Sequence, residues 1–233
     1  MARETPTPLI STRQRPKGAA LRLLRHWFWA KAREKMTRTM DSLTPHQHVE
    51  DRLNNPHRVA AIEWARDHMV SRDFVIFDSE TTGLSSPVDF VEIAVVGPTG
   101  ETLFDSLLKP SCRIEPGARA VHGHTAKSLS GAPRFFEVYP DLLEVLYKRR
   151  VIVFNASYDR RVWDTAVRRL GARGALAGGL PRWECAMHQY ARFIGEPSKR
   201  GGGYRPQKLP GGDHTALGDA LATLCLIEGM AAG

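Results

Sequence analysis

Apolar and polar residues recur with two periods along the chain, and the order of these segments predicts a mixed α/β domain. Apolar runs typical of strands occur at residues 74–78, 88–96, 101–108 and 151–154, with a short fifth run near Trp183. The turn at 97–100 (GPTG) joins the second run to the third and predicts an antiparallel meander. Helical spacing appears at about 135–148, 158–170, 186–193 and 215–230. The order βββαβαβα therefore predicts a mixed five-stranded sheet flanked by helices.

Two further helices are predicted before the first strand. Ala20, Leu24 and Trp27 share one face opposite several arginines, which predicts a basic amphipathic helix. Asn55 as N-cap and Pro56 in the first turn predict a second helix, with its apolar stripe formed by Val59, Ile62 and Met69. We expect a basic tail over 1–40, a helical lead-in over 41–72 and one folded domain over 73–233.

The net charge is concentrated at the N-terminus. The 233-residue chain has 33 Lys and Arg against 25 Asp and Glu, a formal net charge of +8. Residues 1–40 contain ten of the basic side chains and two of the acidic ones, so the rest of the chain is neutral. Basic charge binds nucleic-acid phosphates without regard to sequence, and here that inference applies only to the tail.

Composition and cysteine usage exclude several classes of protein. With 42% hydrophobic and 25% charged residues, the chain is neither a collagen nor a coiled coil nor wholly disordered. The most apolar stretch of the tail, 19–30, is interrupted by Arg22, Arg25 and His26, so we expect no transmembrane segment and no signal peptide. The three cysteines are far apart and odd in number, which indicates neither a disulfide framework nor a zinc site and favours a reducing, cytoplasmic location.

Two acids lie at the end of the first predicted strand, in the segment FDSETTGL (77–84). Because side chains alternate along a strand, Asp78 and Glu80 project from the same face and can converge on one point. Adjacent carboxylates repel unless a cation lies between them, and Mg²⁺ or Mn²⁺ prefers such oxygen ligands. Taken alone, the pair is also consistent with a solvated strand end that runs into a turn.

Two more segments follow later strands. In NASYD (155–159), Asp159 can line the edge of the sheet or balance the start of a helix. In DHTALGD (213–219), residues five apart lie about 140° apart on a helix, so His214 must lie in the preceding loop or in the first turn of the helix that holds Asp219. A histidine on a loop beside carboxylates suits proton transfer, whereas an ordinary helix start capped by Asp213 or Thr215 is the alternative.

Together, FDSETTGL, NASYD and HTALGD resemble the three motifs of the DEDDh exonucleases, the DnaQ-like group that includes the proofreading epsilon subunit of bacterial DNA polymerase III. The resemblance covers about residues 73–230 and includes VHGHT (121–125) and WECAM (183–187). The histidine of the third motif separates this group from relatives with a tyrosine there. The resemblance implies a ribonuclease H-like fold and metal-dependent 3′-to-5′ hydrolysis of DNA in proofreading, repair or end trimming.

The resemblance also implies a role for each matching residue. Asp78 would bridge two divalent metal ions, Mg²⁺ or Mn²⁺, with Glu80 and Asp219 helping to hold the first and Asp159 holding the second through water. His214 would be the general base that deprotonates the attacking water. Residues expected to contact the substrate are Thr82, Gly83, Leu84, His122 and Asn155.

Two features depart from the family pattern. His124 occupies a position of the VHGIT-like element that is usually apolar. The loop at 198–212 is rich in glycine and basic residues and contains Tyr204 and Arg205. Basic groups beside an aromatic ring suit a single strand of nucleic acid, so we expect Tyr204 and Arg205 to bind substrate; a solvated loop is the alternative.

The basic tail lies outside the family pattern and has several interpretations. It can add salt-dependent affinity for nucleic acid, or its helix can dock on an anionic membrane or on a partner such as a DNA polymerase or another replication or repair protein. An organellar transit peptide and a translation start at Met36 or Met40 are further alternatives. We favour attachment to a partner or to nucleic acid.

The expected function is a metal-dependent 3′-to-5′ exonuclease acting on single-stranded DNA ends. An RNA-directed exonuclease is one alternative, and a non-catalytic nucleic-acid- or polymerase-binding module on the same fold is another, because a fold alone does not establish activity. The presence of all five expected catalytic residues favours the enzyme.

Overall fold

The structure is a computed structural model that describes residues 55–171, 181–199 and 201–233, so the predicted basic tail and its helix lie outside the described residues. The strands are β1 (Phe74–Thr81), β2 (Phe90–Val96), β3 (Thr102–Leu107), β4 (Arg150–Val153) and β5 (Arg182–Cys185). The helices are α3 (Pro56–Ser71), α4 (Pro116–His122), α5 (Phe135–Leu146), α6 (Ala156–Arg169), α7 (Ala186–Ile194) and α8 (Ala216–Ala232). None of these described helices combines the length and the apolar character needed to cross a lipid bilayer.

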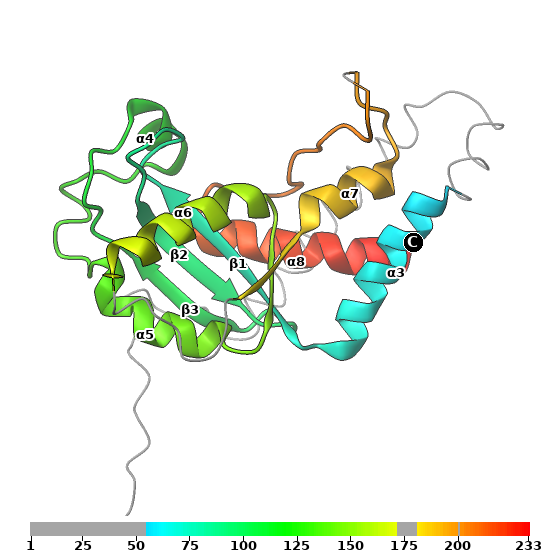
Figure 1. Ribbon diagram of the computed structural model, residues 1–233, viewed down its shortest axis with the longest axis horizontal. Helices are drawn as coiled ribbons and strands as arrows, with labels where there is room; N and C mark the ends of the chain where they lie inside the picture. The colour runs from blue at the N-terminus through cyan, green and yellow to red at the C-terminus, as the bar shows by residue number, and fades with distance from the viewer. Residues whose placement is uncertain (1–54, 172–180, 200) are drawn as a thin grey trace, which may run out of the picture.

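The five strands form one mixed sheet in the order β3-β2-β1-β4-β5 (Figure 1). Strands β1, β2 and β3 are an antiparallel meander, and β4 and β5 run parallel to β1. The predicted meander and the α/β class with a ribonuclease H-like sheet of five strands are confirmed.

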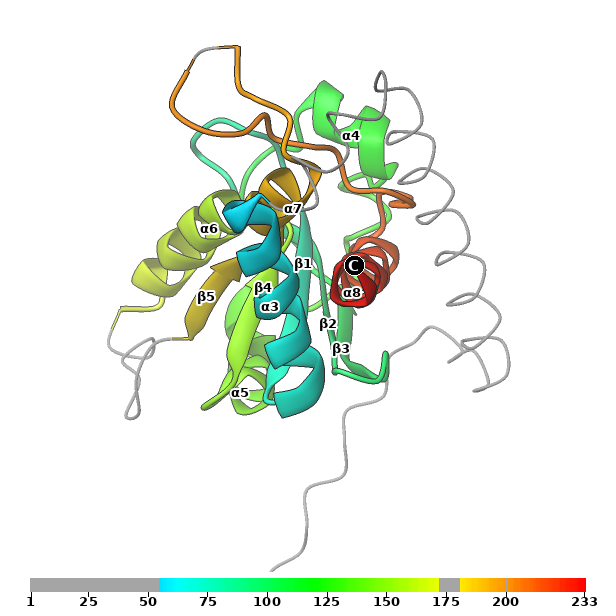
Figure 2. The ribbon, with the colours of Figure 1, turned by 90° about the vertical axis from the view of Figure 1, so that its right-hand side faces the viewer.

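Helices cover both faces of this sheet. Val75 and Phe77 of β1 point to one face, where they pack against α5 and α6. Phe74 and Ile76 point to the other face, where they pack against α3, α7 and α8. Figure 2 shows the sheet between α6 on one side and α8 on the other. Because side chains alternate, the polar end of β1 is divided between the same two faces.

Helix α3 begins as predicted, and its predicted apolar stripe is confirmed only in part, since Ile62 and Met69 are partly buried against the core. Asn55 Oδ1 accepts a hydrogen bond from the backbone N–H of His57 at 2.9 Å. Val59 is exposed, and the buried positions are Arg58, Ala61, Ala65 and His68. The alanines allow close approach to the neighbouring helices, and the Arg58 guanidinium, which would be costly to bury unpaired, donates to the Phe193 carbonyl at 2.6 Å.

Helix α4 was not predicted. Its seven residues are too few to show a helical period, although Pro116 in its first turn and Gly123 after its end are a start and a stop signal. Gly123 adopts a φ of 76°, in the left-handed region that favours glycine. The helix ends at His122 of the VHGHT segment, whose ring contacts the Thr81 carbonyl at the end of β1.

Glu184 on the edge strand β5 joins α3 to the sheet. Its carboxylate accepts hydrogen bonds from Trp64 Nε1 at 2.8 Å and Arg150 Nε at 2.7 Å, and it lies 3.1 Å from His68 Nε2. Burial opposes ionisation, but these donors outweigh it and lower the pKa of Glu184 to about 2.

Replacing Glu184 with Ala is expected to lower the free energy of unfolding by about 2 kcal/mol, because Trp64, His68 and Arg150 lose a shared acceptor. Urea unfolding at neutral pH measures the change. Glu63→Ala on the exposed side of α3 is the matched control, with an expected change below about 0.5 kcal/mol. Equal effects of the two substitutions would contradict the structural role of Glu184.

Candidate active site

Three carboxylates from two elements converge at the end of β1. Asp78 and Glu80 are two residues apart on this strand, on the face covered by α8, and Asp219 lies in the first turn of α8. One carboxylate oxygen from each of the three lies within 4.8 Å of the other two. The predicted convergence of Asp78 and Glu80 is confirmed, and Asp219, which the resemblance assigns to the same ion as Glu80, lies with them.

Asp159 approaches from the other face of the sheet. It lies in the first turn of α6, directly after β4, and is 6% exposed. Ser79 Oγ donates to Asp159 Oδ1 at 2.6 Å. Sequence reasoning missed Ser79, although its odd position between Asp78 and Glu80 directs its side chain toward α6. The hydrogen bond holds Asp159 beside the end of β1.

The carboxylates are electrostatically unfavourable in the absence of a cation. Burial raises the pKa of Asp78 well above its usual range, and the charges of Asp159, Asp219 and Glu80 raise it further. Burial, with a contribution from Asp219, raises the pKa of Glu80 to about 8. Burial also raises the pKa of Asp159 to about 7, although the hydrogen bond from Ser79 opposes the shift. These shifts indicate a place for positive charge.

The surrounding side chains supply little of that charge. Among the described residues, no Lys or Arg forms an ion pair with Asp78, Glu80, Asp159 or Asp219. Burial raises the pKa of Asp219, while backbone N–H groups of Asp213 and His214 lower it in part. A cluster of carboxylate oxygens without a basic partner has the donor set that Mg²⁺ and Mn²⁺ prefer, so the residues present fit a divalent metal site.

The metal-free protein is expected to lose stability as the pH rises from about 5 to about 8. The acids of the site have raised pKa values in the folded state, so in this range the folded chain binds more protons than the unfolded chain and the free energy of unfolding falls with pH. Two groups act in the opposite direction: the lowered pKa of Glu184 only below this window, and the lowered pKa of His122 in its lower part, where several carboxylates with raised pKa values outweigh one histidine. Urea unfolding in EDTA across the range measures the slope, which Mn²⁺ should reduce. A stability that rises with pH in EDTA would contradict this account.

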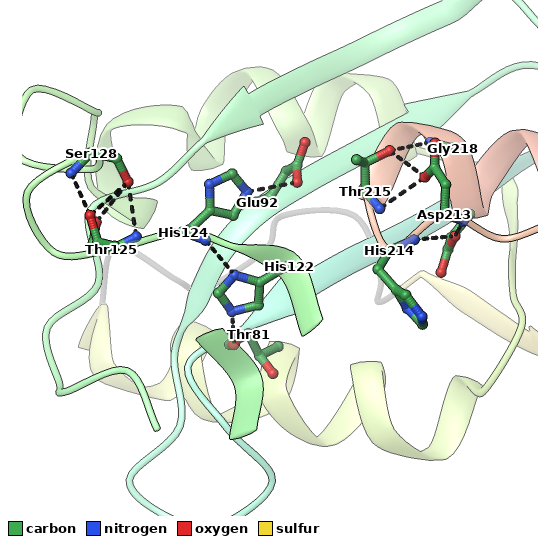
Figure 3. A network of polar contacts seen from close by, with 11 residues as sticks. Thr81, Glu92, His122, His124, Thr125, Ser128, Asp213, His214, Thr215 and Gly218 are labelled. Atoms are coloured by element: carbon green, nitrogen blue, oxygen red, sulfur yellow. Dashed lines mark hydrogen bonds and ion pairs between the residues drawn. The ribbon is translucent and has the colours of Figure 1, made fainter. Parts of the chain in front are cut away.

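The segment before α8 is built by short-range hydrogen bonds. Thr215 is the N-cap, and its Oγ1 accepts from Gly218 N at 3.0 Å. Asp213 Oδ1 accepts from Thr215 N at 3.0 Å and from Thr215 Oγ1 at 2.7 Å (Figure 3). A Cβ atom at position 218 would overlap the Asp213 carboxylate, which explains the glycine inside this helix.

His214 lies in the loop before the helix, which is one of the two positions that the five-residue spacing to Asp219 allows. Its φ of 61° is in the left-handed region, and its backbone N–H donates to Asp219 Oδ1 at 3.2 Å, beside the Asp213 N–H at 2.8 Å. The side chain is exposed, and Figure 3 shows its imidazole extending away from the hydrogen bonds that surround Asp213 and Thr215. Within the part of the chain that the structure describes, the ring makes no hydrogen bond. His214 therefore has a fixed backbone and an available ring.

The loop after β1 is held from both sides. Tyr158 OH lies 2.6 Å from Thr81 Oγ1 and donates to the Gly83 carbonyl at 2.6 Å. On the other side, the Glu115 backbone N–H donates to the Thr82 carbonyl at 2.7 Å, and the Glu115 side chain occupies the place that a Cβ atom of residue 83 would take. The Leu84 side chain is 75% exposed at the end of this constrained loop.

The other predicted substrate residues differ in what surrounds them. Thr82 is buried, and its Oγ1 accepts from Asp89 N at 3.0 Å. His122 donates from Nε2 to the Thr81 carbonyl at 3.2 Å, and burial, followed by the neighbouring His124, lowers its pKa. Asn155 is exposed at the start of α6. His122 therefore lies beside the loop after β1, and Asn155 lies beside the helix that holds Asp159.

Tyr204 and Arg205 contact other elements. Tyr204 OH accepts from Asn55 Nδ2 at 3.0 Å, and its ring meets the edge of His57 at 5.7 Å between centroids. Arg205 pairs with Glu196 at 2.7 Å. Neither side chain forms a hydrogen bond or ion pair with the carboxylate cluster among the described residues. The contacts attach this loop to the start of α3 and the end of α7.

The mixed sheet and its carboxylate cluster are the fold and the kind of site that the resemblance to the DnaQ-like exonucleases predicts. Residues 75–227 match the model of the exonuclease (RNase T) family. The chain belongs to this exonuclease family, and the expected resemblance is confirmed.

The chain is similar to several known members of the family. It is 30% identical to exonuclease CP81 of Escherichia phage 186, over 74% of this chain and 93% of that protein. It is also 30% identical to a DNA polymerase III subunit epsilon-like protein of Rhodobacter capsulatus, over 64% of this chain but only 22% of that protein. A solved structure of exonuclease X in complex with 5′ overhanging duplex DNA is 26% identical, covers 67% of this chain and 90% of its own, and has a TM-score of 0.47.

Proposed function

We propose that the protein is a divalent-metal-dependent 3′-to-5′ exonuclease that releases nucleotides from DNA ends. The observation that carries the proposal is the convergence of Asp78, Glu80 and Asp219 at the end of β1, with Asp159 beside them and no basic partner among the described residues. In a chain of the exonuclease family, this arrangement supports a working site more strongly than a binding module without catalysis.

The carboxylates have distinct positions relative to the expected ions. Asp78 is central, since the charges of Asp159, Asp219 and Glu80 all act on it, and it would contact two Mg²⁺ or Mn²⁺ ions. Glu80 and Asp219 would hold the first ion, and Asp159 would hold the second from the α6 side. When bound, two such ions supply stabilisation of the entering and leaving oxygens of the phosphodiester.

His214 is the proposed general base. Its ring is exposed and makes no hydrogen bond within the described residues, while its backbone N–H is bound to Asp219. A neutral imidazole there can accept a proton from water as the water oxygen bonds to the terminal phosphorus. The bond from phosphorus to the 3′ oxygen of the preceding nucleotide then breaks, and the released oxygen takes a proton from solvent.

The loop after β1 would receive the terminal nucleotide. Its backbone accepts hydrogen bonds from Tyr158 OH and from the Glu115 N–H, and the exposed Leu84 side chain offers an apolar surface for a base. Thr82 and Gly83 would act mainly through the backbone, and His122 and Asn155 would line the same opening. Tyr204 and Arg205 would contact the strand farther from its end if the loop at 198–212 is released from Asn55 and Glu196.

The names of the relatives favour DNA as substrate and a polymerase as partner. One relative is a DNA polymerase III subunit epsilon-like protein, and another is a DNA polymerase III subunit epsilon from Buchnera aphidicola. We infer that the basic segment at 1–40 contributes the attachment to nucleic acid or to a replication or repair protein.

A degradation assay on the full chain tests this function. The substrates are 5′-labelled single-stranded DNA, duplex DNA with a mismatched 3′ end, and RNA, each with Mg²⁺, Mn²⁺ or EDTA. We expect a ladder that shortens from the 3′ end, requires metal and is fastest on DNA. Faster degradation of RNA than of DNA would show that RNA is the preferred substrate. No degradation of any substrate would overturn the enzymatic function.

A further inference from the structure

A fifth carboxylate lies next to the cluster. Glu92 of β2 is directly opposite Glu80 in the antiparallel register, so the two side chains share a face of the sheet. The Glu92 side chain is 0% exposed. Its charge contributes to the raised pKa values of both Asp78 and Glu80. A buried carboxylate at this position needs a partner that keeps it away from the cluster.

His124 supplies such a partner from the loop after α4. Its Nε2 lies 3.2 Å from Glu92 Oε2, and its side chain is only 13% exposed. Its ring is stacked on that of His122, with centroids 5.1 Å apart and an interplanar angle of 26°. The backbone N–H of His124 donates to His122 Nδ1 at 3.0 Å. Figure 3 shows the resulting line of contacts from Glu92 through both histidines to Thr81.

We propose that His124 is a positioning residue that holds the Glu92 side chain out of the carboxylate cluster and braces His122 against Thr81, where the loop for the terminal nucleotide begins. An apolar residue, usual in this element, could fill the space of the ring but could not bind the carboxylate. Glu92 would then lose its contact with His124, and nothing on that side would keep its side chain from moving toward Glu80 across the strand pair. The inference rests on the proposed exonuclease function.

The distinguishing test is a rescue by a second substitution. The variants are His124→Ile, His124→Gln, Glu92→Gln and the double variant His124→Ile/Glu92→Gln, assayed on saturating 5′-labelled DNA with Mn²⁺ under single-turnover conditions. We expect H124I to reduce the rate constant about tenfold and H124Q, which keeps a donor, to remain within about threefold of wild type. The double variant should return to within about threefold of E92Q, because the carboxylate that contacts His124 is gone.

Two results would overturn the proposal: full activity of H124I, or a double variant as slow as H124I. Because a loss of packing would persist in the double variant, recovery separates positioning from a general structural defect. If H124I is unfolded at the assay temperature, His124→Leu, which also lacks a donor, replaces it in the same comparison with E92Q.

A readout without metal separates this inference from the exonuclease proposal. In EDTA, H124I should lower the melting temperature by about 4 °C, and the same change in the E92Q background should lower it by less than about 2 °C. Equal shifts in both backgrounds would show that His124 and Glu92 are not coupled. If these shifts are coupled but the wild-type protein degrades no oligonucleotide, the contact between His124 and Glu92 is supported and its role in catalysis is overturned.

Discussion

Replacing Asp78 with Asn is expected to reduce DNA degradation by about 10³-fold or more and to raise the stability of the metal-free protein. Asn has nearly the same shape but lacks the charge at the centre of the carboxylate cluster. Initial rates on 5′-labelled single-stranded DNA with Mg²⁺ measure the loss of activity. Since Asp78 interacts with Asp159, Asp219 and Glu80 together, no single neighbour can replace its charge.

The gain in stability has the opposite sign from that of most buried substitutions. The pKa of Asp78 is well above its usual range, so ionisation at about pH 8 costs the folded state free energy that a neutral amide does not. We expect D78N to increase the free energy of unfolding in EDTA by about 1 kcal/mol, measured with urea. Asp164→Asn is the control: this half-exposed carboxylate of α6 lies 3.8 Å from Arg160, and its loss should change neither quantity appreciably. A D78N variant that keeps a tenth of the activity, or is less stable than wild type in EDTA, would contradict this account.

Short-range geometry made part of the site predictable. The two-residue period of a strand placed Asp78 and Glu80 on one face, and the helical period separated His214 from Asp219. Each inference needs only a local backbone conformation that neighbouring residues determine. The turn at 97–100 likewise indicated the meander, because consecutive strands joined by a tight turn pair with each other.

Contacts between distant segments were not predictable in this way. The hydrogen bond from Ser79 to Asp159 spans 80 residues, and that from Tyr158 to Gly83 spans 75. The pairing of Glu92 with His124 depends on the register of β2 against β1 and on helix α4, which is too short to show a period. For α3, hydrophobicity predicted that Val59 would be buried, whereas the residues buried by close packing are Ala61 and Ala65. Tertiary packing therefore determines which of several chemically suitable residues support the site.

Charge has different roles in the two parts of the chain. The surplus of basic residues lies at 1–40, where it can add salt-dependent affinity but no chemistry. The neutral remainder contains a cluster of acids that would repel a phosphodiester unless divalent cations were bound there first. Metal binding and nucleic-acid binding at the site should therefore be coupled, with each increasing the affinity for the other.

Replacing His214 with Asn is expected to lower the single-turnover rate constant by about 10²- to 10⁴-fold while Mn²⁺ affinity stays within about threefold of wild type. Asn tolerates the left-handed backbone conformation that His214 adopts at a φ of 61°, so the backbone N–H can still bind Asp219. Asn cannot accept the proton of the attacking water. Calorimetric titration with Mn²⁺ and a single-turnover assay at saturating DNA separate the two effects. His188→Asn, at an exposed histidine of α7, is the matched control.

The pH dependence of the His214→Asn variant distinguishes a base from a structural residue. Without an internal base, hydroxide must remove the proton, so the rate of the variant should continue to rise with pH where the wild-type rate becomes constant. A histidine that only shaped the start of α8 would, when replaced, weaken Mn²⁺ binding through Asp219 and leave the form of the pH profile unchanged. Parallel losses of rate and metal affinity with an unchanged profile would therefore assign His214 to the support of Asp219, and the proton would have to leave by another route.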